Sequence, residues 1–334
     1  SRYFDAYRID HVLGFFRIWE IPISATQGLL GQFSPALGLT QQEIESYGIT
    51  FSEQQFARPF INNQMIERVF HAQASYVKEH YLVHLHDDIY TLKPQFDTQQ
   101  KIATAFANKH TSQDYMLRNG LYTLLNNVLF LNDKQDNKLF HPRIIAHTTF
   151  TYEALSEHHK NCFNRLYNDY FYQRNNQFWY REAMKKLPKL IEATHMLVCA
   201  EDLGMVPTCV SWVMQQLRIL SLEVQSMPKA TNTQFTNLHN VPYRSVCTPS
   251  THDMPTLRQW WDEDTTRAQC YYNAMLYRGG AAPHPLPGWL ARDILSHQLD
   301  SSSMLCVLSI QDWMAIDEKL RLPDSAAERI NVPS

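Results

Sequence analysis

The sequence predicts an α/β fold built on a parallel sheet. Two observations predict it: short apolar runs recur along the chain, and segments with helical spacing lie between them. The runs show little alternation of apolar and polar residues, which is typical of strands covered on both faces. With 334 residues, of which 44% are hydrophobic, the chain can bury a large core.

Five apolar runs are predicted to be the core strands. They cover residues 3–9, 195–201, 219–225, 244–250 and 304–310. A helix is predicted at 208–217, where apolar residues recur at helical spacing directly after Pro207. A second, long helix is predicted over 161–190 until Pro188 interrupts it. Strands that alternate with helices in this way favour parallel pairing.

Residues 24–194 differ in character from the rest of the chain. They are rich in Gln, Asn, His and aromatic residues, and they contain no apolar run typical of a core strand. Helical periodicity is clear over 64–82 and 98–110. We therefore predict that 24–194 is a large, mainly helical insertion after the first strand.

Composition argues against several classes of partner. The net charge of −3 provides no basic excess for binding nucleic acid, and no apolar run approaches the roughly 18 residues of a membrane helix. The six cysteines include no CxxC pair and no zinc-ligand spacing. Cys199, Cys247 and Cys306 lie in short apolar runs and are expected to be buried, reduced thiols, which predicts a reducing compartment, the cytoplasm.

Acidic residues follow three of the predicted strands. Asp10 stands in RIDH, Glu201 in AEDLG and Asp253 in STHD. The carboxyl ends of parallel strands meet at one edge, so these three side chains are expected to converge despite their distance in sequence. Burying three acids together is costly unless they pair with cations, share protons or perform chemistry.

Converging carboxylates suit the cleavage of a glycosidic bond. One acid protonates the leaving oxygen while a second carboxylate attacks the anomeric carbon. Arg8 lies two residues before Asp10, on the same side of a strand, and can hold it ionised. Glu201 would be the proton donor, and His11 and His252 stand beside the acids as natural partners.

These motifs also carry a family resemblance. RIDHVLGFFRIWEIP, VCAEDLGMVP and CTPSTHDMPTLRQWW, in this order, resemble the amylomaltase family of 4-α-glucanotransferases, glycoside hydrolase family 77. The likeness is to the maltose-acting branch that includes plant cytosolic disproportionating enzymes. It extends through KPQFDTQQKIATAF, FWYREAMKKLP and SIQDWMAID to INVP.

The resemblance implies a (β/α)8 TIM barrel, of which residues 1–334 correspond to a partial catalytic domain from strand 4 onward. Residues 24–194 would then be the helical insertion subdomain of the maltose-acting branch. An incomplete barrel exposes apolar strand edges. We therefore expect the isolated chain to form homo-oligomers through its open edge or to cover that edge with its own insertion.

The resemblance also assigns roles to individual residues. It implies that Asp10 is the nucleophile, Glu201 the acid/base and Asp253 the carboxylate that stabilises the transition state. It predicts six substrate-binding residues: Arg8, His11, Asp202, His252, Gln311 and Asp312. The implied substrates are maltose, malto-oligosaccharides and glucan acceptors, and neither a metal nor a cofactor is required.

Other functions stay open at this point. The chain could be an α-glucan hydrolase of the same clan, an inactive or sugar-binding fragment, or, more remotely, a metal hydrolase. The histidines and aspartates of 84–88 have the side chains of metal ligands, but a solvated loop explains them better. Of Trp260 and Trp261, one is expected to pack in the core and one to face sugar.

Overall fold

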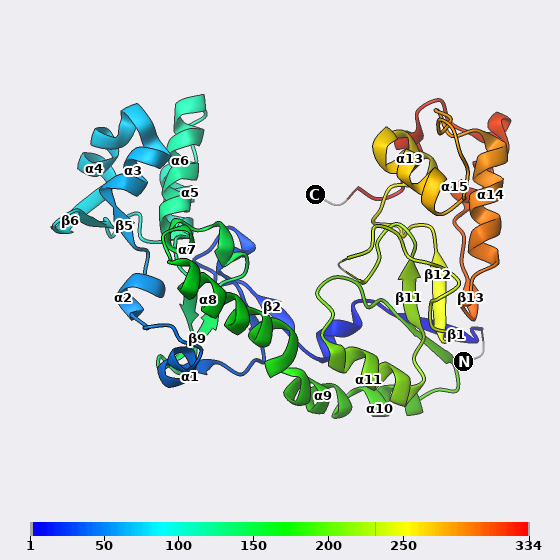
Figure 1. Cartoon of the computed structure of the whole chain (residues 1–334), viewed down its shortest axis with the longest axis horizontal. Coiled ribbons are helices and arrows are strands. Elements are labelled where there is room, and N and C mark those ends of the chain that lie inside the picture. The colour runs from blue at the N-terminus through cyan, green and yellow to red at the C-terminus, as the bar shows by residue number, and fades with distance from the viewer. Residues whose placement is uncertain (1–2, 231, 333–334) are drawn as a thin grey trace. The chain divides into compact units, whose positions relative to one another are not determined.

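The computed structural model describes residues 3–230 and 232–332. The chain divides into two compact units (Figure 1). Ser1–Phe15 and Glu182–Ser334 form the first, which we call the sheet unit, and Phe16–Arg181 form the second, the insertion unit.

Five parallel strands form the centre of the sheet unit (Figure 1). They are β1 (Ala6–Ile9), β10 (Leu197–Ala200), β11 (Ser221–Val224), β12 (Ser245–Thr248) and β13 (Leu305–Cys306). β1 pairs with β10, β11 with β12, and β12 with β13. β10 and β11 are joined by a parallel bridge between Cys199 and Leu220. The five predicted strands and their parallel arrangement are confirmed.

Burial alternates along β10. In β10, Val198 and Ala200 are buried while Leu197 and Cys199 are only partly covered. On β12, the buried Cys247 thiol contacts the carbonyl oxygen of Gln298 at 3.4 Å. Helices therefore cover one face of the sheet. The expectation that both faces are covered is wrong for the described chain, because the other face lines an open cavity.

The helices of the sheet unit lie between and after the strands. They are α10 (Leu187–Glu192), α11 (Thr208–Leu217), α12 (Leu257–Asp262), α13 (Thr265–Ala274), α14 (Gly288–Leu299) and α15 (Ile310–Met314). The boundaries of α11 are those predicted. Side chains of α12, α13 and α14 share one apolar core, which includes Trp261, Tyr271 and Ile294.

The insertion unit contains more strand than predicted. Three antiparallel sheets, β2–β3, β4–β9–β8 and β5–β7–β6, occur there. Their strands are β2 (Ile18–Glu20), β3 (Gln32–Ser34), β4 (Leu39–Thr40), β5 (Ile61–Asn62), β6 (Leu82–His86), β7 (Ile89–Leu92), β8 (Phe130–Asn132) and β9 (Leu139–Pro142). At two to five residues each, they are too short to produce an apolar run in the sequence.

Four helices of the insertion unit, α3, α4, α5 and α6, share one apolar core. The helices of this unit are α1 (Gln41–Ser46), α2 (Glu53–Phe56), α3 (Asn63–Phe70), α4 (Ala74–Tyr81), α5 (Gln99–Ala105), α6 (Ser112–Leu125), α7 (Phe150–Glu153) and α8 (Glu157–Asp169). The helix predicted over 64–82 is thus two helices, separated at His71, whose φ of 47° breaks the helical path.

The long helix predicted over 161–190 is also interrupted. A π-helical segment, Tyr170–Arg174, follows α8, and α9 (Asn176–Met184) comes next. Pro188 lies in the first turn of α10, where its missing N–H costs no hydrogen bond. Since the insertion unit spans Phe16–Arg181, it starts and ends earlier than the predicted 24–194.

Candidate active site

Asp10 and Glu201 leave the sheet side by side. Ile9, the last residue of β1, is in register with Ala200, the last residue of β10. The Glu201 N–H donates to the Ile9 carbonyl oxygen at 2.9 Å, and the Val12 N–H donates to the Glu201 carbonyl oxygen at 3.0 Å. The backbone that carries Glu201 is therefore fastened to the segment that carries Asp10.

The Glu201 carboxylate is held by backbone donors. Its Oε2 accepts from the His11 N–H at 3.1 Å and its Oε1 accepts from the Leu203 N–H at 2.8 Å. The His11 ring nitrogen Nδ1 lies 3.6 Å from Oε2, and the glutamate side chain is 14% exposed. His11 has a φ of 50°, in the left-handed region that non-glycine residues seldom adopt. This strained conformation aims the His11 N–H at Glu201.

Arg8 and Asp10 form the ion pair that their spacing predicts. Arg8 Nη2 lies 2.7 Å from Asp10 Oδ1. The aspartate side chain is 81% exposed, so the pair adds little to stability and serves mainly to orient the carboxylate. Asp10 is thus accessible to a ligand from outside the sheet.

Asp253 is held by the C-terminal segment of the described chain. Asn331 Nδ2 donates to Asp253 Oδ1 at 2.5 Å, and Arg329 Nη2 donates to the Asp253 carbonyl oxygen at 2.8 Å. His252 Nε2 lies 3.2 Å from Asp253 Oδ2. No local pattern in the sequence predicts a role for Arg329 or Asn331, although Asn331 stands in the INVP segment that contributes to the resemblance.

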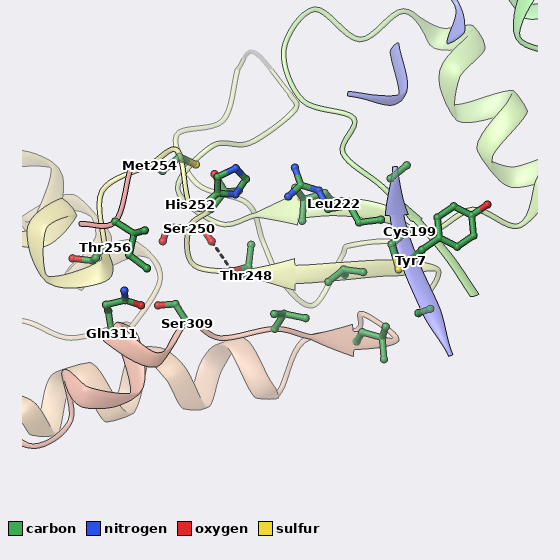
Figure 2. Close-up of a pocket in the computed structure, with 18 of the residues that line it drawn as sticks. Tyr7, Cys199, Leu222, Thr248, Ser250, His252, Met254, Thr256, Ser309 and Gln311 are labelled. Carbon is green, nitrogen blue, oxygen red and sulfur yellow. Dashed lines mark hydrogen bonds between the residues drawn. The ribbon is translucent and has the colours of Figure 1, made fainter. Parts of the chain in front are cut away.

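A cavity of about 490 Å³ runs along the open face of the sheet to the carboxyl ends of its strands (Figure 2). Gln311 and Ser309 lie toward one end of the cavity and Cys199 toward the other, with Thr248 between them. Among the predicted site residues, Arg8, His252 and Gln311 line the cavity. The three predicted catalytic acids do not line it.

Asp202 and Asp312, both predicted to bind substrate, are buried in the described structure. Asp202 Oδ1 accepts from the Leu222 N–H at 2.9 Å, and its Oδ2 lies 2.7 Å from Lys229 Nζ. Burial raises the Asp202 pKa to about 6 even though Lys229 acts to lower it. Asp312 accepts from the Leu257 N–H at the start of α12, and burial raises its pKa too. Both carboxylates are engaged in the protein interior.

A family model described as 4-alpha-glucanotransferase, glycoside hydrolase family 77, matches residues 1–334. The chain belongs to this family. It is 35% identical over 339 aligned residues to the 4-alpha-glucanotransferase DPE2 of Oryza sativa subsp. japonica, and the match covers 100% of this chain and 36% of the rice protein. A 4-alpha-glucanotransferase of Chlamydia caviae is 30% identical over 44% of this chain and 28% of its own length. This chain thus spans about a third of the rice protein.

Two solved amylomaltases overlap with parts of this family 77 chain. The enzyme of Streptococcus agalactiae in complex with acarbose gives a TM-score of 0.34 at 16% identity, covering 47% of this chain and 28% of the other. The amylomaltase of Corynebacterium glutamicum gives a TM-score of 0.31 at 13% identity, covering 73% and 37%.

Neither tryptophan of the third family 77 motif faces the site, contrary to the prediction for one of them. Trp261 is fully buried, and its Nε1 donates to the Pro283 carbonyl oxygen at 2.9 Å. Trp260 packs edge-on against Phe235 and Tyr271. Helix α12 directs both rings into the apolar core that it shares with α13 and α14.

The remaining predictions concern metals and membranes. Within 3–230 and 232–332, no group of three or more His, Cys, Asp or Glu side chains is placed to hold a metal ion. His84 and His86 lie on the exposed hairpin of β6 and β7, where both contact Asp87. Over the same described ranges, no helix has the length and apolar character needed to cross a membrane.

Proposed function

We propose that this family 77 chain is a 4-α-glucanotransferase that moves α-1,4-linked glucosyl units from maltose or malto-oligosaccharides to glucan acceptors. One observation carries the proposal: Asp10 and Glu201 emerge at the paired ends of neighbouring parallel strands, with the Glu201 backbone bonded to the Asp10 segment. An acid and a nucleophile that act on one glycosidic bond must be neighbours of this kind. Membership of the family supports the same substrates.

The mechanism we propose is a retaining double displacement. Asp10 attacks C1 of the donor sugar while Glu201 protonates the departing oxygen, which yields a covalent glucosyl-enzyme. Glu201, now ionised, takes the proton from an acceptor 4-hydroxyl, and that oxygen displaces Asp10 from C1. Arg8 orients Asp10 before the attack, and Asp253 stabilises positive charge on the sugar ring.

We also propose that the five parallel strands are part of a (β/α)8 barrel. The support is the parallel order of β1, β10, β11, β12 and β13, with helices against one face and a cavity along the other. In such a barrel the cavity face is the interior, and the carboxyl ends of the strands hold the catalytic groups. His11, His252 and Gln311 would then contact sugar hydroxyls at that end.

The test is a disproportionation assay on this chain with maltose as donor and glycogen as acceptor. We expect glucose release together with longer glucan chains, and a loss of at least about a thousandfold for Asp10→Asn because the nucleophile is removed. Asp5→Asn, just before β1, is the matched control and should retain activity. Glucose release without chain lengthening indicates a hydrolase, and equal transfer by the wild type and Asp10→Asn refutes the site.

A further inference from the structure

A compact ion cluster lies directly beside Glu201. Lys229 Nζ is 2.7 Å from Asp202 Oδ2 and 2.8 Å from Glu223 Oε1. Ser221 Oγ donates to the same glutamate oxygen at 2.9 Å. The two carboxylate side chains are 6% and 9% exposed, so the lysine joins two acids that are largely removed from water.

Asp202 takes the place of a backbone acceptor where β10 separates from β11. Up to that point the strands pair through their main chains: the Leu220 N–H donates to Val198 and the Ala200 N–H donates to Leu220, both at 2.9 Å. The Ser221 N–H donates to Arg244 on the other side, and the next N–H on the β10 side, that of Leu222, donates instead to Asp202 Oδ1. The chain can therefore leave β11 at Glu201 without leaving a buried N–H unpaired.

The backbone around Glu201 is therefore held by hydrogen bonds both to the β1 segment and to β11. On the β1 side, its backbone N–H and carbonyl oxygen bond to Ile9 and Val12. On the β11 side, the following residue, Asp202, is anchored to Leu222 and, through Lys229, to Glu223. A side chain that must donate and then accept a proton at a fixed oxygen benefits from such a rigid support.

The composition of the cluster argues against a purely stabilising role. Two buried carboxylates share one ammonium group, so their mutual repulsion and the loss of hydration oppose the attraction to Lys229. Apolar residues of similar volume commonly stabilise a fold at least as well as a buried ion pair does. Fixing the geometry beside Glu201 is a function that apolar residues could not perform.

We propose that Asp202, Lys229 and Glu223 form a positioning cluster that holds the Glu201 carboxyl in place for proton transfer. This inference rests on the proposed function, in which Glu201 is the acid/base. The bonds that define the cluster run between its own side chains and to the Leu222 N–H, so in this role the three residues act only through Glu201. Asp202 accepts from the Leu222 N–H of β11, Lys229 pairs with Asp202 and restricts its side chain, and Glu223 pairs with Lys229.

The test combines kinetics with hydrogen exchange on the full chain. Lys229→Met removes the central cation, and Asp202→Asn keeps an acceptor for the Leu222 N–H while losing the attraction to Lys229. Asp133→Asn is the matched control in the insertion unit, because Asp133 also accepts from backbone N–H groups and from His141. Hydrogen exchange of the His11 and Leu203 amides reports the position of Glu201 without any assay of activity.

For the two cluster variants, exchange at these amides should rise about tenfold, while amides within β11 and β12 stay protected. Transfer kcat should fall by about ten- to a hundredfold with KM within about twofold, because positioning is lost but binding is not. Unchanged exchange and kcat in both variants would overturn the inference. If the wild type transfers no glucosyl units but the two variants still exchange faster at these amides, the positioning cluster is supported and the proposed function is refuted.

Discussion

The buried carboxyl of Asp202 lowers the stability of the fold at neutral pH, because burial disfavours its ionised form. Burial raises its pKa from 3.8 to about 6, so between these values the folded state binds more protons than the unfolded state. The neutral carboxyl stabilises the fold fully below pH 3.8, and this contribution is lost as the pH rises through about 6. At neutral pH the loss amounts to about 3 kcal/mol.

Asp202→Asn should therefore change how stability depends on pH. The asparagine cannot ionise, so the free energy of unfolding of the variant relative to the wild type should increase between pH 4 and 7 by about 2–3 kcal/mol. Urea denaturation at a series of pH values measures the difference. A difference that stays constant across this range would show that Asp202 titrates in the folded state as it does in the unfolded one. The same variant is expected to lose activity, which separates stability from function.

Helices α3 and α6 of the insertion unit pack closely against each other. Gly120 lies in α6, and a Cβ atom at this position would overlap the ring of Phe70 in α3. Gly120→Ala should raise helix propensity by roughly 1 kcal/mol, but overpacking costs about 1–3 kcal/mol because both helices belong to one tightly packed core. We expect a net destabilisation, measured by urea denaturation. Gly279→Ala, where no atom lies within 4 Å of the new Cβ, is the control and should change stability little. A more stable Gly120→Ala variant would show that α3 and α6 can move apart.

Local sequence pattern predicts some elements of this chain and not others. The core strands were predictable because each is one apolar run, and Asp10 and Glu201 were predictable because they directly follow such runs. The short strands of the insertion unit were not, since their pairing depends on hairpins and long-range contacts rather than on local pattern. Lys229 and Asn331 gave no signal of their link to the site, because Asp202 lies 27 residues from Lys229 and Asp253 lies 78 residues from Asn331. The inward direction of the Asp202 side chain was likewise not predictable, because it depends on the contact with Lys229 in the loop after β11.

At the scale of the whole molecule, the open face of the sheet remains the unusual feature. Leu305 and Val307, which line the cavity from β13 and just beyond it, are 37% and 57% exposed. An apolar sheet face beside an edge strand promotes association through burial of apolar area and strand pairing. We predict that the isolated chain associates with a second copy through this face.

Light scattering coupled to size-exclusion chromatography, over a concentration series, measures that association. Val307→Lys should shift the equilibrium toward monomer, by about tenfold or more in dissociation constant, because an unpaired charge would be buried at the contact. Ile23→Lys is the matched control, since Ile23 is an exposed apolar residue of the insertion unit and lies outside this face. A wild-type chain that stays monomeric at every concentration contradicts the prediction, as does an equal effect of both substitutions. Because the face continues to His252 and Gln311 at the candidate site, association through it should also compete with malto-oligosaccharide binding.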